Sequence, residues 1–127
     1  MATARVLLVE DECLIRLAAA EALQDAGFEV VEAQDGEGAA KLLDGAGRFD
    51  LLFTDVQMPG TLDGIDVATH VRHRHPAIPV LVVSGYAADL THRLGGLLPP
   101  VVFINKPYDL QEIVTVLSRM IGRPRPL

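Results

Sequence analysis

Five short apolar runs divide the chain, and segments with helical spacing of apolar residues separate them. The first run, residues 5–10 (RVLLVE), is continuous rather than alternating, which is typical of a strand buried on both faces. Four later runs have the same character. The pattern therefore predicts five strands, at residues 5–10, 28–33, 50–55, 79–83 and 101–104.

Between and after these runs the apolar period changes to that of a helix. From residue 12 onward Leu14, Ile15, Leu17, Ala18, Ala22 and Leu23 recur at helical spacing, and Gly27 is placed to end that helix. Further helices are predicted at 37–44, where Asp35 can cap the first turn, at 65–73 and at 110–121. Residues 87–100 give the weakest helical pattern, because only about two turns precede Gly95 and Gly96.

Strands that alternate with helices favour parallel βαβ units with right-handed crossovers. We therefore predict an α/β fold: a doubly wound, five-stranded parallel sheet with helices on both faces. No repeat or linker divides the chain, so residues 1–127 should form a single domain with its core at about 5–121 and a flexible tail at 122–127.

Composition narrows the class of protein. Hydrophobic residues make up 50% of the 127 residues and charged residues 22%, as in a globular domain. The formal net charge of −6 argues against binding to nucleic acid. The single cysteine cannot form an internal disulfide, and no window resembles a signal peptide or a membrane span. We expect a soluble, cytoplasmic protein.

Chemically active side chains follow four of the predicted strands. Glu10 and Asp11 end the first, Asp55 the third, Ser84 the fourth, and Lys106 follows the fifth. Each alone would most often be a helix cap, a turn residue or a surface residue. However, the carboxyl ends of parallel strands meet at one edge of an open sheet, where sites of such folds form. We therefore expect these residues to lie together.

The gathered residue types suit a phosphoryl group. Neighbouring carboxylates raise one another's pKa unless a cation is present, and Mg²⁺ accepts carboxylate, carbonyl and water oxygens. A lysine can pair with a carboxylate or a phosphoryl oxygen, and a hydroxyl can donate to the latter. Asp55, central in this set, would be the nucleophile.

At these positions the sequence resembles the receiver domains of two-component response regulators. The resemblance rests on VEDE (residues 9–12), TDVQMPG (54–60) with DG at 63–64, VSGY (83–86) and NKP (105–107), in the family's order. It covers residues 5–121 and implies a flavodoxin-like sheet of strand order 2-1-3-4-5. The Met1 start and short tail favour a stand-alone receiver over an excised piece.

The resemblance also implies roles for the site residues. Asp55 looks like the phosphoacceptor, and Lys106 would pair with it and then with the phosphoryl group. A Mg²⁺ or Mn²⁺ ion would be held by Asp11, by Asp55, by the backbone carbonyl of Gln57 and, through water, by Glu10.

Other positions correspond to switching and tuning residues of the family. Ser84 stands at the switch hydroxyl and Phe103 at the aromatic residue that moves inward on activation. Gly85 would leave room for the phosphoryl group to enter, while Gln57 and Tyr86 would tune its lifetime.

Four features depart from the usual receiver pattern. Glu10 is longer than the more frequent Asp, and TLDG (61–64) makes its loop one residue longer. Phe103 lacks the hydroxyl of the more usual Tyr. The weak fourth helix falls on the face that many receivers use for output.

The resemblance implies that a histidine kinase or a histidine phosphotransfer protein donates a phosphoryl group to Asp55, and that the surface for an unknown downstream target then changes. A phosphorylation-dependent homodimer is a further expectation; membrane insertion is not expected. The protein would be no enzyme beyond self-catalysed phosphotransfer and autodephosphorylation.

Three other interpretations stay open. The chain could be a receiver-like adaptor that binds proteins without phosphorylation, or a receiver that shuttles or drains phosphoryl groups. The third is a phosphatase with an aspartyl-phosphate intermediate. Such enzymes often carry a second acid two residues after the nucleophile, where this chain has Gln57.

Overall fold

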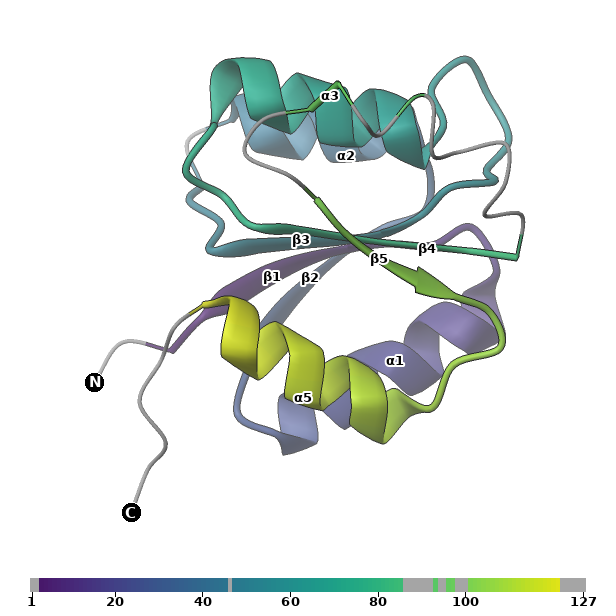
Figure 1. The fold of residues 1–127 in the computed structure, drawn as a ribbon, viewed down its shortest axis with the longest axis vertical. Coiled ribbons are helices and arrows are strands. Elements are labelled where there is room, and N and C mark those ends of the chain that lie inside the picture. The colour runs from purple at the N-terminus through teal and green to yellow at the C-terminus, as the bar shows by residue number, and fades with distance from the viewer. Residues whose placement is uncertain (1–2, 46, 86–92, 94–95, 98–100, 122–127) are drawn as a thin grey trace.

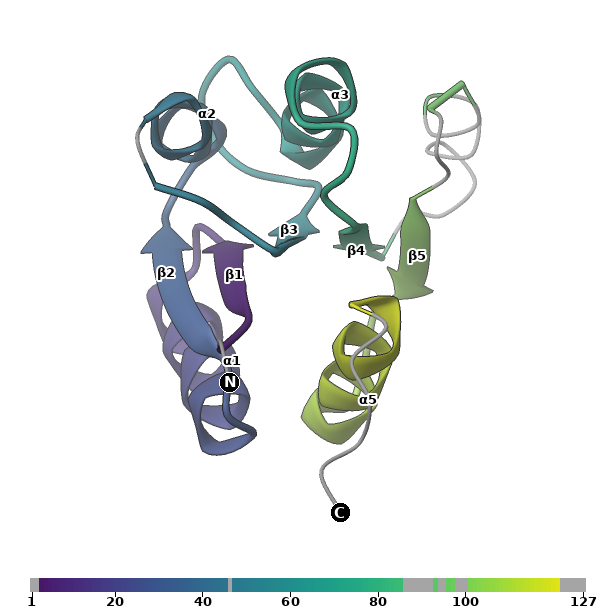
Figure 2. The ribbon, with the colours of Figure 1, turned by 90° about the vertical axis from the view of Figure 1, so that its left-hand side faces the viewer.

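A computed structural model describes residues 3–45, 47–85, 93, 96–97 and 101–121. Its sheet has five parallel strands in the order β2-β1-β3-β4-β5 (Figure 2), which confirms the predicted fold class and strand order. The strands are β1 (Arg5–Val9), β2 (Glu29–Ala33), β3 (Leu51–Asp55), β4 (Val80–Ser84) and β5 (Val102–Asn105).

Helices cover both faces of this sheet. Helices α1 (Cys13–Asp25) and α5 (Leu110–Met120) lie on one face, and α2 (Gly36–Asp44) and α3 (Gly64–Arg74) lie on the other (Figure 1). The four helices confirm four of the predicted segments to within a few residues at each end. The weakest predicted helix, residues 87–100, falls mostly outside the described residues, as does the predicted tail.

The continuous apolar strands supply two separate cores. Successive residues of a strand point to opposite faces, so Leu52 packs on the side of α2 and α3, while Leu51 and Phe53 pack on the side of α1 and α5. All five residues of β3 and all five of β4 are buried. The centre of the sheet is therefore a rigid platform, and the residues at its carboxyl edge are fixed by it.

Helix α1 buries only part of its apolar surface. Ala19, Ala20 and Leu23 contribute to the core, whereas Leu14 is 76% exposed and Leu17 50% exposed. These three residues lie on the face of the helix that meets the sheet, whereas the leucines of the first turns lie on another face. The helix ends as its sequence predicts, because Gly27 has a φ of +98° just after the C-cap.

Side-chain caps begin the other helices. The Asp35 carboxylate accepts the Gly38 N–H at 2.7 Å, as predicted, and Asp63 and Asp66 form a reciprocal capping box at the start of α3. Within the described part of the chain, no helix has both the length and the apolar character that crossing a membrane requires.

Candidate functional site

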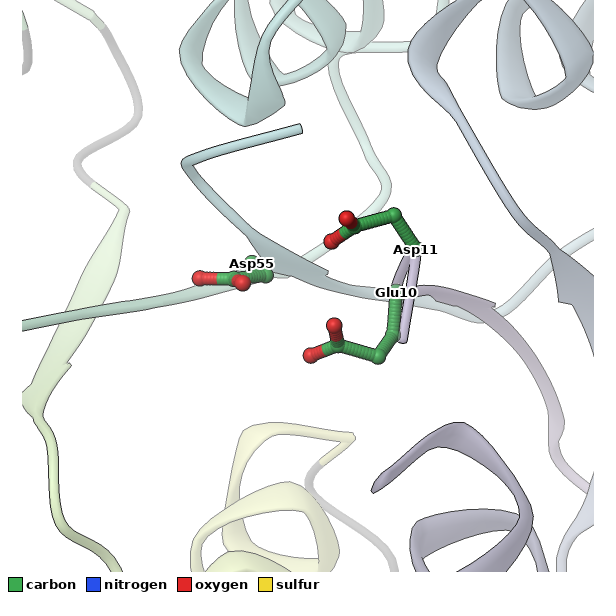
Figure 3. A group of neighbouring side chains, drawn as sticks. All are labelled: Glu10, Asp11 and Asp55. Atoms are coloured by element: carbon green, nitrogen blue, oxygen red, sulfur yellow. The ribbon is translucent and has the colours of Figure 1, made fainter. Parts of the chain in front are cut away.

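Three carboxylates gather at the carboxyl edge of the sheet. Glu10 and Asp11 follow β1, Asp55 ends the neighbouring β3, and the side chains of Glu10 and Asp11 extend toward Asp55 (Figure 3). One carboxylate oxygen from each lies within 4.8 Å of the other two. Glu10 and Asp55 are buried and Asp11 is exposed, so the cluster opens to solvent on the side of Asp11.

Asp55 is held by contacts to both of its carboxylate oxygens. The Val56 N–H donates to Oδ1 at 2.9 Å, and the Lys106 ammonium donates to Oδ2 at 3.0 Å. The Thr54 hydroxyl donates to the Asp55 backbone carbonyl at 2.8 Å. These contacts orient a carboxylate whose side chain is only 7% exposed, so a reactant can approach it from few directions.

Glu10 is a buried acid in a region of surplus negative charge. Burial raises the pKa of its carboxyl, and the negative charge of Asp55 raises it further, although the Glu12 N–H and the Lys106 ammonium act in the opposite direction. The Glu12 N–H donates to Glu10 Oε2 at 3.0 Å. The Glu12 N–H thus orients the Glu10 side chain, but the favourable contacts offset only part of the cost of removing its carboxylate from water.

The backbone of Glu10 is also fixed, by β2 and by α1. Its N–H donates to the Ala33 carbonyl at 3.1 Å. Its carbonyl accepts Nη1 of Arg16 at 2.9 Å, and Nε of the same guanidinium donates to Glu32 Oε1 at 3.1 Å. The turn that carries both Glu10 and Asp11 is therefore tied to two neighbouring elements.

The cluster fits a hard divalent cation. Among the described residues, Asp55 has Lys106 as an ion-pair partner, whereas no ion pair is formed by Glu10 or Asp11. Carboxylate oxygens at this spacing are the ligands that Mg²⁺ and Mn²⁺ prefer, and a bound cation offsets their repulsion. The residues present are thus suited to the predicted metal, and the individual ligand roles of Glu10, Asp11 and Asp55 stay predictions.

The predicted lysine and hydroxyl end the adjoining strands. Lys106 comes directly after β5, and its N–H donates to the Ser84 carbonyl at 2.9 Å, which ties the ends of β4 and β5 together. Ser84 is almost fully buried, at 1% exposure. Val83, the residue before it, is the register partner of Asp55. The structure thus brings Asp55, Lys106 and Ser84 to one edge, as the sequence predicted.

The remaining predicted residues are less closely tied to the cluster. Phe103 is half-buried and packs against the core on the side of α2 and α3. Gln57 is exposed on the loop between β3 and α3, and a Cβ at Gly85 would meet no heavy atom within 4 Å. The switching and tuning roles of these residues stay predictions. Tyr86 lies outside the described residues.

Sequence reasoning missed Tyr108, which borders the site. Its ring packs edge-on against Phe53, with 6.2 Å between ring centroids. Burial raises the pKa of Tyr108 to about 12, and the negative charges of Glu10 and Asp55 add to this shift. Its place two residues after Lys106 was the available signal, but spacing alone does not show that the ring turns back toward β3.

A shallow apolar hollow of about 570 Å³ lies beside the site. Leu14, Ile15 and Ala18 of α1 form one side, and Lys106, Pro107, Tyr108 and Leu110 form the other. Lys106 lines this hollow and also donates to the carboxylate of Asp55, so its side chain lies between the hollow and the acidic edge.

Comparison with known proteins gives a consistent result. Residues 6–118 match the family model of the response regulator receiver domain. The sensor kinase CckA of Brucella abortus is 36% identical over 95% of this chain, which spans 13% of that kinase. The chain also spans less than two thirds of the length of other curated relatives that it matches.

Two solved structures have the same fold. A response regulator receiver protein from Sinorhizobium medicae matches with a TM-score of 0.86 and 26% identity, over 94% of this chain and 95% of that one. The response regulator TrrA of Thermotoga maritima, solved in complex with Mg(2+)-BeF, matches with a TM-score of 0.79 and 27% identity. That match covers 93% of this chain and 99% of TrrA.

Proposed function

Because this chain belongs to the family of response regulator receiver domains, we propose that Asp55 accepts a phosphoryl group from a phosphohistidine and that the modified domain changes its affinity for a protein target. The observation that carries this proposal is the surroundings of the Asp55 carboxylate, which combine one ammonium group with two further carboxylates. This carboxylate pairs with Lys106 at 3.0 Å and lies within 4.8 Å of two further carboxylate oxygens.

The transfer itself needs little more than positioning and charge. An Asp55 carboxylate oxygen forms a bond to phosphorus as the phosphorus–nitrogen bond of the phosphohistidine breaks. The electron pair of that bond stays with the departing imidazole nitrogen, which takes up a proton. Val56 and Lys106 restrict the orientation of the carboxylate through their hydrogen bonds, so the attack starts from a prepared geometry.

Asp11, Asp55 and the backbone carbonyl of Gln57, with Glu10 acting through water, would hold a Mg²⁺ ion, which would supply positive charge to the oxygens of the transferring group. The complex of TrrA with Mg(2+)-BeF is in keeping with such a site in a relative of this fold. The Lys106 ammonium can move from the carboxylate to a phosphoryl oxygen, because the transfer neutralises one carboxylate oxygen while it introduces new anionic ones.

A switch through Ser84 and Phe103 completes the proposal. Ser84 is buried one residue beyond the register partner of Asp55, which suits a hydroxyl that turns toward a phosphoryl group. Phe103 pairs in register with Val82 on the same two strands, two residues before the Asn105 that faces Ser84. Movement of the hydroxyl would free space that the Phe103 ring can fill, which alters the surface of β5.

The hollow beside Lys106 supports a protein as the phosphodonor, a histidine kinase or a histidine phosphotransfer protein. A small donor needs only the acidic edge, whereas a donor protein must bury surface next to Asp55. Leu14, Ile15 and Tyr108 offer apolar surface there, and Leu14 is largely exposed. Lys106 lies between that surface and the acidic cluster of the neighbouring strand ends, so a partner helix with apolar residues for the hollow and a basic residue for the cluster is the best complement.

The test compares two aspartates of the same strand region. Wild type, Asp55→Asn and Asp50→Asn are incubated with acetyl phosphate and Mg²⁺, and the phosphorylated fraction is measured by intact-protein mass spectrometry. Asp55→Asn should take up no phosphoryl group, because the amide is not a nucleophile of this kind. Asp50→Asn should match wild type, since Asp50 lies at the opposite end of β3.

Uptake by Asp55→Asn at the wild-type level would overturn the assignment. If only Asp55→Asn fails to take up the phosphoryl group, a phosphotransfer profile against the histidine kinases of the source organism identifies the donor. Equal target binding by wild type and Asp55→Asn, with and without phosphodonor, would instead favour the adaptor that works without phosphorylation.

A further inference from the structure

Arg16 makes two directed contacts behind the acidic edge. Nη1 donates to the backbone carbonyl of Glu10 at 2.9 Å, and Nε donates to the carboxylate of Glu32 at 3.1 Å. The side chain is 16% exposed, so these contacts are partly shielded from water. Arg16 belongs to α1, Glu32 to β2, and Glu10 follows β1, so one guanidinium connects three elements.

These contacts bear on the orientation of the acids. The Glu10 carbonyl belongs to the peptide unit that continues into Asp11. Rotation of that peptide would move the Asp11 carboxylate away from its neighbours and would disturb the Glu12 N–H that binds Glu10 Oε2. A hydrogen bond to this carbonyl therefore acts on two of the three carboxylates in the cluster.

We propose that Arg16 is a positioning residue for the metal site: it holds the turn at residues 10–12 so that the Glu10 and Asp11 carboxylates face Asp55. This inference rests on the proposed function, because it assumes that the three carboxylates bind Mg²⁺. It assigns to Arg16 no contact with the metal or with the phosphoryl group.

The planar guanidinium is suited to this task. Its N–H bonds point in fixed directions within one plane, so pairing with Glu32 through Nε determines where Nη1 points. A lysine would supply the charge without that geometry. Residues that orient metal ligands in this way commonly change metal affinity about 10- to 100-fold when they are replaced.

The chain contains a matched control at the opposite edge of the same strands. Arg5 donates through Nε to Glu29 of β2 at 3.0 Å and through Nη1 to the Arg48 carbonyl at 3.1 Å. Both arginines thus pair with a β2 glutamate and a backbone carbonyl. They differ in that the carbonyl bound by Arg16 lies in the acidic turn, whereas that of Arg48 lies before β3.

Calorimetric titration with Mg²⁺ separates positioning from simple charge. Removal of a positive charge near the cluster should strengthen Mg²⁺ binding, because the repulsion between two cations is lost. Loss of positioning should weaken it. The sign of the change therefore decides between the two effects, and the titration is independent of phosphoryl uptake.

We expect Arg16→Gln to weaken Mg²⁺ binding about tenfold. Arg16→Lys should also weaken Mg²⁺ binding, since the ammonium restores the charge but not the two directed donors of the guanidinium. Arg5→Gln should leave Mg²⁺ affinity within about twofold of wild type, even where its unfolding temperature falls as much as that of Arg16→Gln. Glu32→Gln keeps Arg16 as the donor to the Glu10 carbonyl, so its Mg²⁺ affinity should lie between those of wild type and Arg16→Gln.

Unchanged or stronger Mg²⁺ binding by Arg16→Gln would overturn the inference. Should that variant fail to fold, wild-type affinity in both Arg16→Lys and Glu32→Gln would overturn it equally. A wild-type chain that neither binds Mg²⁺ nor takes up a phosphoryl group would overturn the proposed function and this inference with it, and is thus distinguishable from failure of the Arg16 role alone.

Discussion

Strand β3 is flanked by an aspartate at each end, and the two meet opposite surroundings. Asp50, just before the strand, is exposed and accepts the backbone N–H of Arg5 at 2.8 Å, while its own N–H donates to the Arg5 carbonyl. Asp55, the last residue of the strand, is buried beside two other carboxylates and one ammonium. The residue type and the strand are the same, but the balance of charge is not.

The difference lies in how each charge is compensated. At the amino end, Asp50 closes a reciprocal pair with the backbone, and the Arg5 guanidinium neutralises Glu29 nearby. At the carboxyl end, Lys106 cannot offset three carboxylates by itself. At the amino end the Asp50 carboxylate is exposed to water and accepts a backbone N–H, whereas at the buried carboxyl end a bound cation would offset the surplus of negative charge. The first arrangement serves stability, and the second suits reversible chemistry.

The first test of this comparison between the two ends of β3 replaces Lys106, and we expect the largest effect there. In Lys106→Gln the rate of phosphoryl uptake from acetyl phosphate should fall about 100-fold, the typical cost of losing one donor to developing negative charge. Lys41 of α2, the only other lysine in the chain, gives the matched control. Initial rates at saturating Mg²⁺ measure the effect, and equal rates for Lys106→Gln and Lys41→Gln would contradict the role of Lys106.

A second, smaller effect concerns stability without Mg²⁺. Asp50→Asn should lower the free energy of unfolding by about 1 kcal/mol, because it weakens a charge-assisted hydrogen bond. Asp55→Asn should raise the unfolding temperature in the same buffer, since it removes one of three repelling carboxylates. Urea and thermal denaturation with chelator present give the two values. If both variants were destabilised alike, the surplus of negative charge at the carboxyl edge would not govern its stability.

The smallest effect is on the titration of Tyr108, whose pKa is raised mainly by burial and further by the negative charges of Glu10 and Asp55. The pKa of Tyr108 is raised to about 12 from an ordinary value of 10.0. A raised pKa means that the folded state retains the phenolic proton, so Tyr108 contributes stability below pH 10 that is lost as the pH rises from 10 to 12.

Phenolate absorbance of Tyr86→Phe, which leaves Tyr108 as the only tyrosine, measures this titration. Additional replacement of Glu10 by Gln should shift the Tyr108 transition to lower pH. A Tyr108 transition that Glu10→Gln leaves unchanged would show that the negative field of Glu10 at this edge is weak.

The fold and the centre of the site could be predicted from sequence because their signals are local. Continuous apolar runs predict buried parallel strands, and the polar residue that ends each run must lie at the carboxyl edge. Asp11, Asp55 and Lys106 follow from this rule. The predicted ends of the strands differ from the observed ends by a residue or two, because a strand extends only as far as its hydrogen bonds to the neighbouring strand.

Other features depend on contacts that spacing does not encode. The spacing of Leu14 and Leu17 predicts a helix, but the small Ala19 and Ala20 determine which face meets the sheet. Likewise, the return of the Tyr108 ring to Phe53 joins residues that lie far apart in the sequence. Such contacts become visible only once the helices are packed on the sheet.

One backbone contact bears on how much this protein can vary. The Gly64 N–H donates to the Val56 carbonyl at 2.9 Å, and a Cβ at Gly64 would collide with the Asp55 carbonyl. The chain therefore leaves β3 and enters α3 at one closed junction, whatever the length of the segment between them. A change in the length of that segment therefore need not move Asp55, because the Gly64 contacts fix where the segment ends.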